Sequence, residues 1–200
     1  MEDDDRVKIQ RIYDIYGLGV LRPVAQGQSF PRMESWLAGL MMRETEGGLS
    51  PLLVDVCNTP DIPDDDVGDS GHGHGLFQID DRAYPEFCLS ENWKDPFKSA
   101  HFVSGILHER KTTLRMYVWG ASLNPTDLER AILASYNAGA GAVLRAIRGG
   151  YDVDQVTTGR NYSARVLQYA AIYEAIVRGQ EAEPVPPAPV AAGGFTLSGS

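Results

Sequence analysis

The chain is organised around Asp69-Ser-Gly-His-Gly-His-Gly-Leu-Phe-Gln-Ile-Asp80. This stretch has a carboxylate at each end and glycines at positions 71, 73 and 75. Glycine at these positions lets the backbone turn tightly or come close to a ligand. The apolar, strand-like residues 75–79 then lead into Asp80. We therefore expect a small strand region here, with an acidic side chain at each end of the stretch.

A helix upstream of this stretch is predicted to carry a further acidic side chain, Glu44. Its apolar face is predicted by residues at the spacing i, i+3, i+4, i+7 and i+8, namely Met33, Trp36, Leu37, Leu40 and Met41. Ser29 is the expected cap, Pro31 stands in the expected first turn, and Gly47-Gly48 ends the helix. Glu44 falls on the apolar face, where burial raises a carboxyl pKa. An exposed charge in the last helical turn is the alternative.

The rest of the chain reads mainly as helices and connecting loops. Further helices are predicted over residues 6–16, 95–119, 124–139, 142–148 and 161–178. Residues 17–30 read as a loop because they are rich in Gly, Pro and Gln, and residues 52–56 read as a short strand. Residues 180–200 are rich in Pro, Ala and Gly, which is typical of a disordered tail or linker. The pattern predicts an α+β, mostly α, domain over residues 1–179 with a cleft.

Composition and charge narrow the classes of function. The 200 residues are 43% hydrophobic, which suits one domain with its own core, and no apolar run reaches the length of a membrane span. The net charge of −9 argues against a nucleic-acid partner, because phosphate binding needs a basic surface. No basic segment followed by an apolar one stands at the N-terminus, so we expect no signal peptide, and the location of the protein stays open.

Histidine and cysteine give no metal site and no disulfide framework. His72 and His74 are too close in sequence to form a site alone, and His108 lacks the second histidine of a zinc-binding helix. We expect neither a metal nor an organic cofactor. Cys57 and Cys88 allow one disulfide at most, and two reduced thiols are the alternative.

Three carboxylates have the chemistry that hydrolysis of a glycosidic bond requires. One carboxylic acid protonates the leaving oxygen, and in an inverting enzyme a second carboxylate activates water from farther away. Glu44 is the candidate acid, and Asp69 and Asp80 are the candidate bases. An ordinary turn stabilised by Asp80 is the structural alternative.

Three motifs in order carry a resemblance to a known family. Arg43-Glu44-Thr45 is similar to the Arg-Glu-Ser of goose-type lysozymes and soluble lytic transglycosylases, which belong to the lysozyme-like superfamily. Residues 75–80, Gly-Leu-Phe-Gln-Ile-Asp, resemble their Gly-Leu-Met-Gln-Val-Asp. Residues 134–141, Ala-Ser-Tyr-Asn-Ala-Gly-Ala-Gly, resemble their Ala-Tyr-Asn-Ala-Gly-x-Gly. The resemblance spans roughly residues 30–175.

The resemblance implies a lysozyme-like fold with a small β-hairpin region beside a glycan-binding cleft. It also implies cleavage of the β-1,4 bond between N-acetylmuramic acid and N-acetylglucosamine in peptidoglycan. Glu44 matches the general acid of the family, and Asp69 and Asp80 match the aspartates that hold the attacking water. Contacts with the substrate are expected from Gln78, Tyr84, Tyr136, Asn137 and Tyr162. The alternatives are orientation of the loop by Gln78, helix-end packing by Tyr136 and Asn137, and packing in the core by Tyr162.

Other readings stay open beside the inverting muramidase. Lytic transglycosylases generally lack the aspartate pair and use a hydroxyl of the substrate, which gives an anhydro sugar. The interval between Glu44 and Asp69 is longer than in the goose-type enzymes, which bears on the geometry of Asp69. Chitin is an alternative substrate, because this neutral polymer would repel an acidic protein less than anionic peptidoglycan does. A glycan-binding or structural module of a wall-crossing phage or injection assembly, attached through the C-terminal tail, is the alternative without catalysis.

Overall fold

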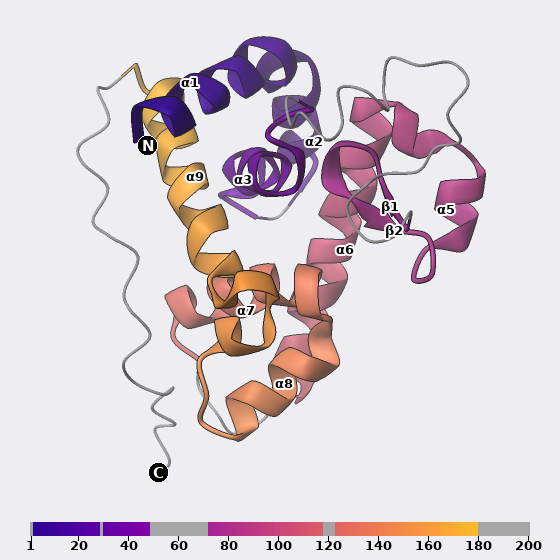
Figure 1. The fold of residues 1–200 in the computed structure, drawn as a ribbon, viewed down its shortest axis with the longest axis vertical. Helices are drawn as coiled ribbons and strands as arrows, with labels where there is room; N and C mark the ends of the chain where they lie inside the picture. Colours follow the sequence, from indigo (N-terminus) through magenta and orange to yellow (C-terminus); the bar gives the residue numbers. More distant parts are fainter. Residues whose placement is uncertain (1, 29, 49–71, 118–122, 180–200) are drawn as a thin grey trace. The chain divides into compact units, whose positions relative to one another are not determined.

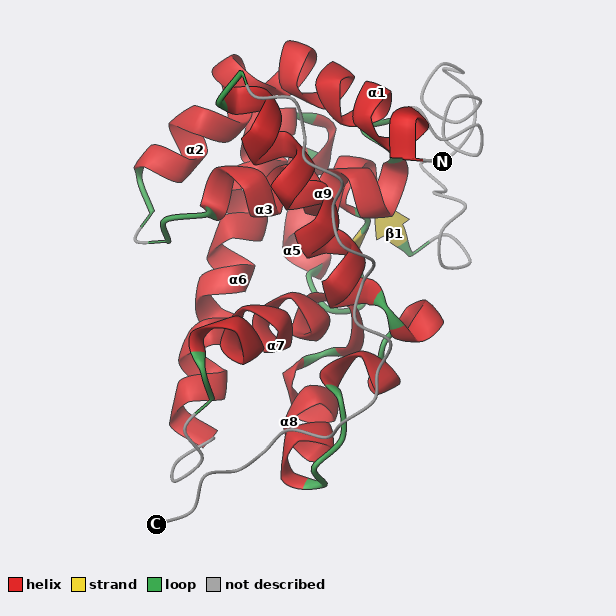
Figure 2. Ribbon diagram, turned by 90° about the vertical axis from the view of Figure 1, so that its left-hand side faces the viewer, coloured by secondary structure: helices red, strands yellow, loops and turns green. Residues whose placement is uncertain are grey.

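The computed structural model describes residues 2–28, 30–48, 72–117 and 123–179. These residues form mostly helices with one small antiparallel sheet (Figures 1 and 2). The α+β, mostly α, fold class expected from the sequence is confirmed. Five features predicted from the sequence lie outside the described residues: the Ser29 cap, the strand at 52–56, Cys57, Asp69 and the tail over 180–200.

The described chain divides into two compact units. The first comprises the described residues up to Ser104 together with those from Tyr169 onward. The second is Gly105–Gln168. Glu44, Gln78, Asp80 and Tyr84 belong to the first unit. The remaining candidate residues, Tyr136, Asn137 and Tyr162, belong to the second.

The N-terminal segment is helical farther than the sequence indicated. Three helices follow one another directly: α1 (Glu2–Ile12), the π-helix η1 (Tyr13–Leu21) and α2 (Arg22–Gln26). The prediction of a loop over 17–30 is therefore wrong as far as Gln26. Gly17 fits because it is buried where a Cβ atom would lie 2.8 Å from the Tyr13 ring. Pro23 stands in the first turn of α2, directly after the π-helix, and supplies no backbone N–H to the helical run there.

Helix α3 (Met33–Thr45) is the buried helix of the first unit. Ten of its thirteen residues are buried, and the exceptions are Glu34, Arg43 and Glu44. The prediction of a single apolar face was therefore too narrow, because a helix apolar on all sides is buried all round. The predicted start near Pro31 is also corrected, since α3 begins after Arg32 without a side-chain cap. It packs against α1, η1 and α2 (Figure 1).

The predicted β-hairpin is present but shorter than expected. β1 (Gly73–His74) pairs antiparallel with β2 (Ile79–Asp80). Residues 75–77 form a 3-10 turn, η2 (Gly75–Phe77), instead of a strand. Gly75 and Gln78 have φ values of 68° and 49°, so the backbone turns back at both ends of η2. The extended reading failed because these left-handed positions depend on turn geometry that periodicity does not reveal.

The hairpin is followed by shorter elements and then by long helices. In chain order these are α5 (Pro85–Leu89), η3 (Asn92–Lys94), α6 (Pro96–Tyr117), α7 (Pro125–Ala138), α8 (Ala140–Arg148), η4 (Val153–Val156), η5 (Thr158–Arg160) and α9 (Tyr162–Val177). The predicted helices over 124–139, 142–148 and 161–178 are confirmed within two residues at each end. Asn124 caps α7, because its Oδ1 accepts a hydrogen bond from the Asp127 N–H at 2.9 Å.

Candidate functional site

Glu44 lies in the last turn of α3 and is half-buried. The helix ends just beyond it at Glu46, which has a left-handed φ of 53° and donates its N–H to the Met42 carbonyl oxygen at 3.1 Å. The Glu46 carboxylate itself is paired with Lys8, whose Nζ lies 2.9 Å from Oε2. Glu46 is therefore committed to an ion pair with α1. Glu44 is the acidic side chain that the buried helix presents at this end.

Thr45 joins the end of α3 to the hairpin. Its side chain is 1% exposed, and its Oγ1 lies 2.9 Å from the Leu76 carbonyl oxygen and 3.2 Å from the Met41 carbonyl oxygen. The same oxygen accepts a hydrogen bond from the Gly48 N–H at 3.2 Å. The residue next to Glu44 is thus fixed to η2, the turn that precedes Asp80. This bond couples the position of the candidate acid to that of the hairpin.

Gln78 stabilises the hairpin turn from within. Its Nε2 donates to the Gly75 carbonyl oxygen at 3.0 Å. Its side chain also occupies the space beside Gly73, where a Cβ atom would lie 2.5 Å from Gln78 Oε1. These contacts support the alternative in which Gln78 orients the loop.

Asp80 is held by Arg82, two residues farther along the chain. The Asp80 carboxylate accepts Arg82 Nε at 2.9 Å, Arg82 Nη2 at 2.7 Å and the Arg82 backbone N–H at 2.8 Å. These hydrogen bonds lower the pKa of Asp80 below its ordinary value. The side chain is 38% exposed, so the carboxylate is accessible to water although it is paired. Asp80 is an anion with reduced basicity in this arrangement.

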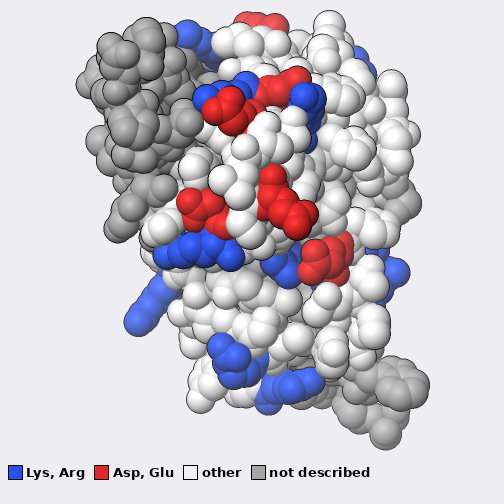
Figure 3. Space-filling view, turned by 90° about the vertical axis from the view of Figure 1, so that its right-hand side faces the viewer, with Lys and Arg blue, Asp and Glu red and all other residues white. Residues whose placement is uncertain are grey.

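Asp81 has a separate set of partners on the other strand. Its two carboxylate oxygens lie 2.8 Å from His72 Nδ1 and 3.2 Å from His74 Nε2. Hydrogen bonds from His74 and His72 lower the pKa of Asp81. Asp80 and Asp81 thus each have side-chain partners, and Figure 3 shows basic side chains interspersed with acidic ones on one face.

Tyr84 stands at the start of α5 and packs by its ring. The ring lies edge-on to Phe102 of α6, with the centroids 5.2 Å apart. Phe102 is in turn stacked on Phe87, with the centroids 3.9 Å apart. Tyr84 is half-buried, so this aromatic cluster holds its ring in place while part of the side chain remains accessible.

The candidate residues of the second unit lie at helix ends. Asn137 is exposed in the last turn of α7, and its Oδ1 accepts a hydrogen bond from the Thr158 N–H at 2.9 Å. Tyr136, beside it, is half-buried. Tyr162 is the first residue of α9 and is 2% exposed, which matches the alternative of a core aromatic.

A buried ionic network fixes the start of α9 in the same unit. Asp154, 2% exposed, accepts hydrogen bonds from the Ser163 N–H at 2.8 Å, Ser163 Oγ at 2.8 Å and the Ala164 N–H at 3.1 Å. Arg130 Nη2 lies 3.2 Å from Asp154 and 2.8 Å from Asp152. Asp154 therefore acts as the helix cap for α9 from nine residues away. This network sets the position of Tyr162.

Sequence reasoning missed three residues that shape these surroundings. Arg82 follows Asp80 at a spacing that turns often bridge, so a local signal for it existed. Thr45 is part of the Arg-Glu-Thr motif, but its partner, a backbone carbonyl 31 positions away, has no sequence signature. Asp154 has no signal either, because its role depends on the tertiary approach of η4 to α9.

The comparisons with known proteins assign no family. No family model matches the chain, and no curated protein matches it. Within the described ranges, no three His, Cys, Asp or Glu side chains come together as a metal site would require. Across the same ranges, no helix is both long enough and apolar enough to cross a membrane.

Proposed function

We propose that the chain is a peptidoglycan-degrading muramidase that cleaves the β-1,4 bond between N-acetylmuramic acid and N-acetylglucosamine. The observation that carries the proposal is the hydrogen bond from Thr45, the neighbour of Glu44, to the carbonyl of Leu76 in the hairpin that bears Asp80. It links the segments that carry Glu44 and Asp80 within one compact unit. The resemblance to goose-type lysozymes supplies the reaction.

Glu44 is the proposed general acid. It is half-buried at the end of a helix whose other surfaces lie in the core, so its backbone is rigidly held. A rigid support is what proton donation to a leaving sugar oxygen requires, because the carboxyl must meet that oxygen at hydrogen-bond distance. Tyr84, Tyr136, Asn137 and Tyr162 are proposed to support sugar binding.

Asp80 and Asp69 are the proposed water-positioning pair of an inverting mechanism. The contacts of Asp80 favour a positioning role over a basic one. Its carboxylate already accepts hydrogen bonds from three Arg82 N–H groups, and each of them would be weakened by protonation. Asp69 is then the proposed proton acceptor.

The pairing of Asp80 with Arg82 favours a second candidate function, a lytic transglycosylase. In that reaction a hydroxyl of the substrate displaces the leaving sugar, and no aspartate needs to activate water. A carboxylate made less basic by Arg82 is compatible with this reaction. Chitin remains the alternative substrate, and a glycan-binding module of a larger assembly remains the alternative without catalysis.

Digestion of purified peptidoglycan by the wild-type chain and by Glu44→Gln tests the proposal. We expect the substitution to lower the rate of solubilisation by at least about 100-fold, because general acid catalysis typically contributes that much or more. Glu46→Gln is the matched control, since Glu46 lies on the same helix end but is paired with Lys8. It should retain activity. Activity retained by Glu44→Gln would overturn the proposal.

Mass spectrometry of the released fragments separates the candidate reactions. Reducing ends indicate the hydrolase, and anhydromuramic ends indicate the transglycosylase. Release from chitin oligomers but not from peptidoglycan would indicate a chitinase. Binding of the wild-type chain to sedimented walls without any release would favour the binding module.

A further inference from the structure

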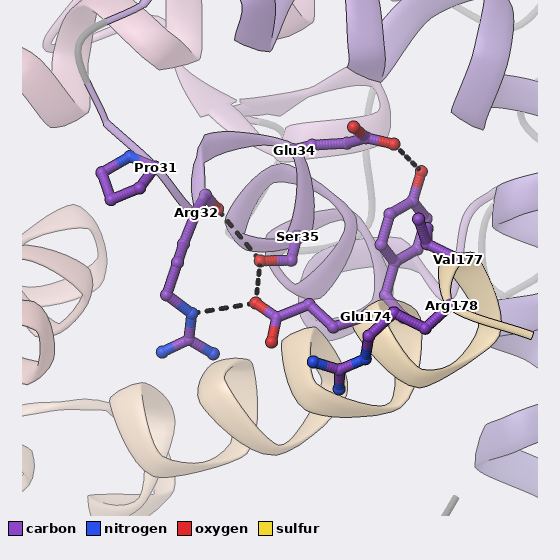
Figure 4. Close-up of a pocket in the computed structure, with 8 residues that line it drawn as sticks. Pro31, Arg32, Glu34, Ser35, Glu174, Val177 and Arg178 are labelled. Carbon is purple, nitrogen blue, oxygen red and sulfur yellow. Dashed lines mark hydrogen bonds and ion pairs between the residues drawn. The ribbon is translucent and has the colours of Figure 1, made fainter. Parts of the chain in front are cut away.

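A pocket of about 320 Å³ opens between the first turn of α3 and the last turns of α9. Both segments belong to the first unit. The residues that matter for its chemistry are Pro31, Arg32, Ser35, Glu174, Val177 and Arg178 (Figure 4). Ser35 and Glu44 are nine residues apart on α3, or about 14 Å at ~1.5 Å per residue, so the pocket is separate from the candidate catalytic residue.

Most charged groups around the pocket are already paired. Glu174 Oε1 accepts hydrogen bonds from Ser35 Oγ at 2.7 Å and from Arg32 Nε at 2.9 Å. Glu34, on the same wall, accepts the Tyr173 hydroxyl at 2.9 Å and lies 3.3 Å from Arg22 Nε. These bonds give the pocket a fixed, pre-formed polar wall, which reduces the ordering cost of binding.

Two groups in the pocket have no partner of their own among the described residues. One is the guanidinium of Arg178, and the other is the second oxygen of Glu174, Oε2. Figure 4 shows the Glu174 carboxylate between the guanidinium groups of Arg32 and Arg178. Among the described residues here, Arg22 pairs with Glu34 and Arg32 with Glu174, which leaves the positive charge of Arg178 without a counter-ion. A monoanion therefore satisfies the charge, whereas a phosphate dianion would exceed it beside two carboxylates.

The unpaired groups also specify the shape of the anion. A guanidinium forms two parallel hydrogen bonds with a carboxylate. Glu174 Oε2 can only accept, so it selects a neighbouring N–H donor on the ligand. Pro31 and the 39%-exposed Val177 offer apolar contact to a short aliphatic side chain. The volume lies at the small end of the range for ligand pockets and suits a group of dipeptide size.

We propose that this pocket binds the free carboxyl end of a peptide that terminates in a small aliphatic residue. Arg178 holds the carboxylate, Glu174 accepts the last peptide N–H, and Pro31 with Val177 contacts the side chain. The site goes beyond the proposed glycosidase and does not depend on it. Wall peptides linked to muramic acid carry ends of this kind, so the pocket would hold a wall peptide apart from the sugar chain.

Isothermal titration calorimetry with N-acetyl-D-alanyl-D-alanine and with N-acetyl-L-alanyl-L-alanine tests the proposal. We expect saturable binding of at least one of these probes to the wild-type chain. The C-terminal amide of the peptide that binds should bind at least about tenfold more weakly than the acid, because the amide removes a charge-assisted hydrogen-bond pair. Arg178→Gln should weaken binding of the acid by a similar factor. Arg11→Gln is the matched control, because Arg11 is an exposed arginine on α1, and this variant should bind as the wild type does.

Three outcomes would overturn the proposal: equal binding of acid and amide, unchanged binding by Arg178→Gln, or no saturable binding of either peptide up to about 10 mM. Glu44→Gln should bind the peptide as the wild type does. Failure of the glycosidase proposal is therefore distinguishable from failure of this one.

Discussion

Replacement of Thr45 by valine tests the link between the helix that carries Glu44 and the hairpin that carries Asp80. Valine keeps the size of the side chain and removes only the hydroxyl. That hydroxyl lies 2.9 Å from the Leu76 carbonyl oxygen and accepts the Gly48 N–H at 3.2 Å. The side chain is 1% exposed, so water does not readily replace it.

The size of the effect follows from the groups left without a partner. A buried donor or acceptor that loses its partner costs about 1–3 kcal/mol. Thr45→Ser is the matched control, because serine keeps the hydroxyl and loses one methyl group, worth about 0.8 kcal/mol. We therefore expect Thr45→Val to be less stable than Thr45→Ser. The proposed activity should fall with the valine variant for the same reason, since Glu44 adjoins the broken link.

Amide hydrogen exchange followed by NMR measures the effect locally. The Asp81 N–H donates to the His72 carbonyl oxygen at 3.0 Å across the base of the hairpin. A loss of 1–3 kcal/mol predicts exchange at this amide that is faster by about 5- to 150-fold in Thr45→Val. The Gly139 N–H, bonded to the Ser135 carbonyl oxygen in the second unit, is the internal control and should not change.

The reasoning would be refuted by equal protection of the Asp81 amide in the valine and serine variants. It would also be refuted if protection fell equally at Asp81 and Gly139. The second result would mean that Thr45 acts on the stability of the whole chain and not on the link between α3 and the hairpin.

Three further substitutions test other parts of the structure. Arg82→Gln should raise the pKa of Asp80, which carboxyl NMR measures. Because this pKa is lowered in the folded chain, the Arg82–Asp80 pair stabilises the fold above about pH 4, by no more than about 1 kcal/mol for exposed groups. The difference in unfolding free energy between wild type and variant should vanish as pH falls through the folded pKa of Asp80. Asp154→Ala should lower the free energy of unfolding in urea by about 1–3 kcal/mol, because it leaves the Ser163 and Ala164 N–H groups at the start of α9 without their acceptor, while Arg130 keeps Asp152. A loss under about 0.5 kcal/mol would contradict this. Gly17→Ala should destabilise the fold by about 1–3 kcal/mol, since its Cβ would lie 2.8 Å from the Tyr13 ring. Gly19→Ala is the control, because its Cβ would meet nothing within 4 Å. Equal melting temperatures of the two variants would show that the close contact at Gly17 is harmless.

The hairpin shows what could be predicted from the sequence and what could not. Alternating glycines with an apolar run located it, and the structure confirms two short antiparallel strands. The 3-10 turn at Gly75–Phe77 was not predicted, because it depends on the left-handed backbone of Gly75 and Gln78. The pairing of Asp80 with Arg82 likewise follows from that turn.

In the N-terminal segment the sequence predicted a loop where the structure has a helix. Gly17, Gly19 and Pro23 are helix-breaking residues by propensity, so residues 17–30 read as a loop. Burial of Gly17 against Tyr13 overrode that propensity. Local preference is weak beside the packing of a helix on α3, and single-residue rules failed here for that reason.

The sequence by itself determined the helices α7, α8 and α9, because periodic apolar residues and capping residues such as Asn124 act within one or two turns of chain. It also determined which carboxylates are candidates, through the motifs around Glu44 and Asp80. The tertiary structure decided which groups are paired. Thr45 meets Leu76, Asp154 caps α9, and Arg178 is left unpaired in a pocket, because each depends on segments brought together by burial of the core and not by their spacing along the chain.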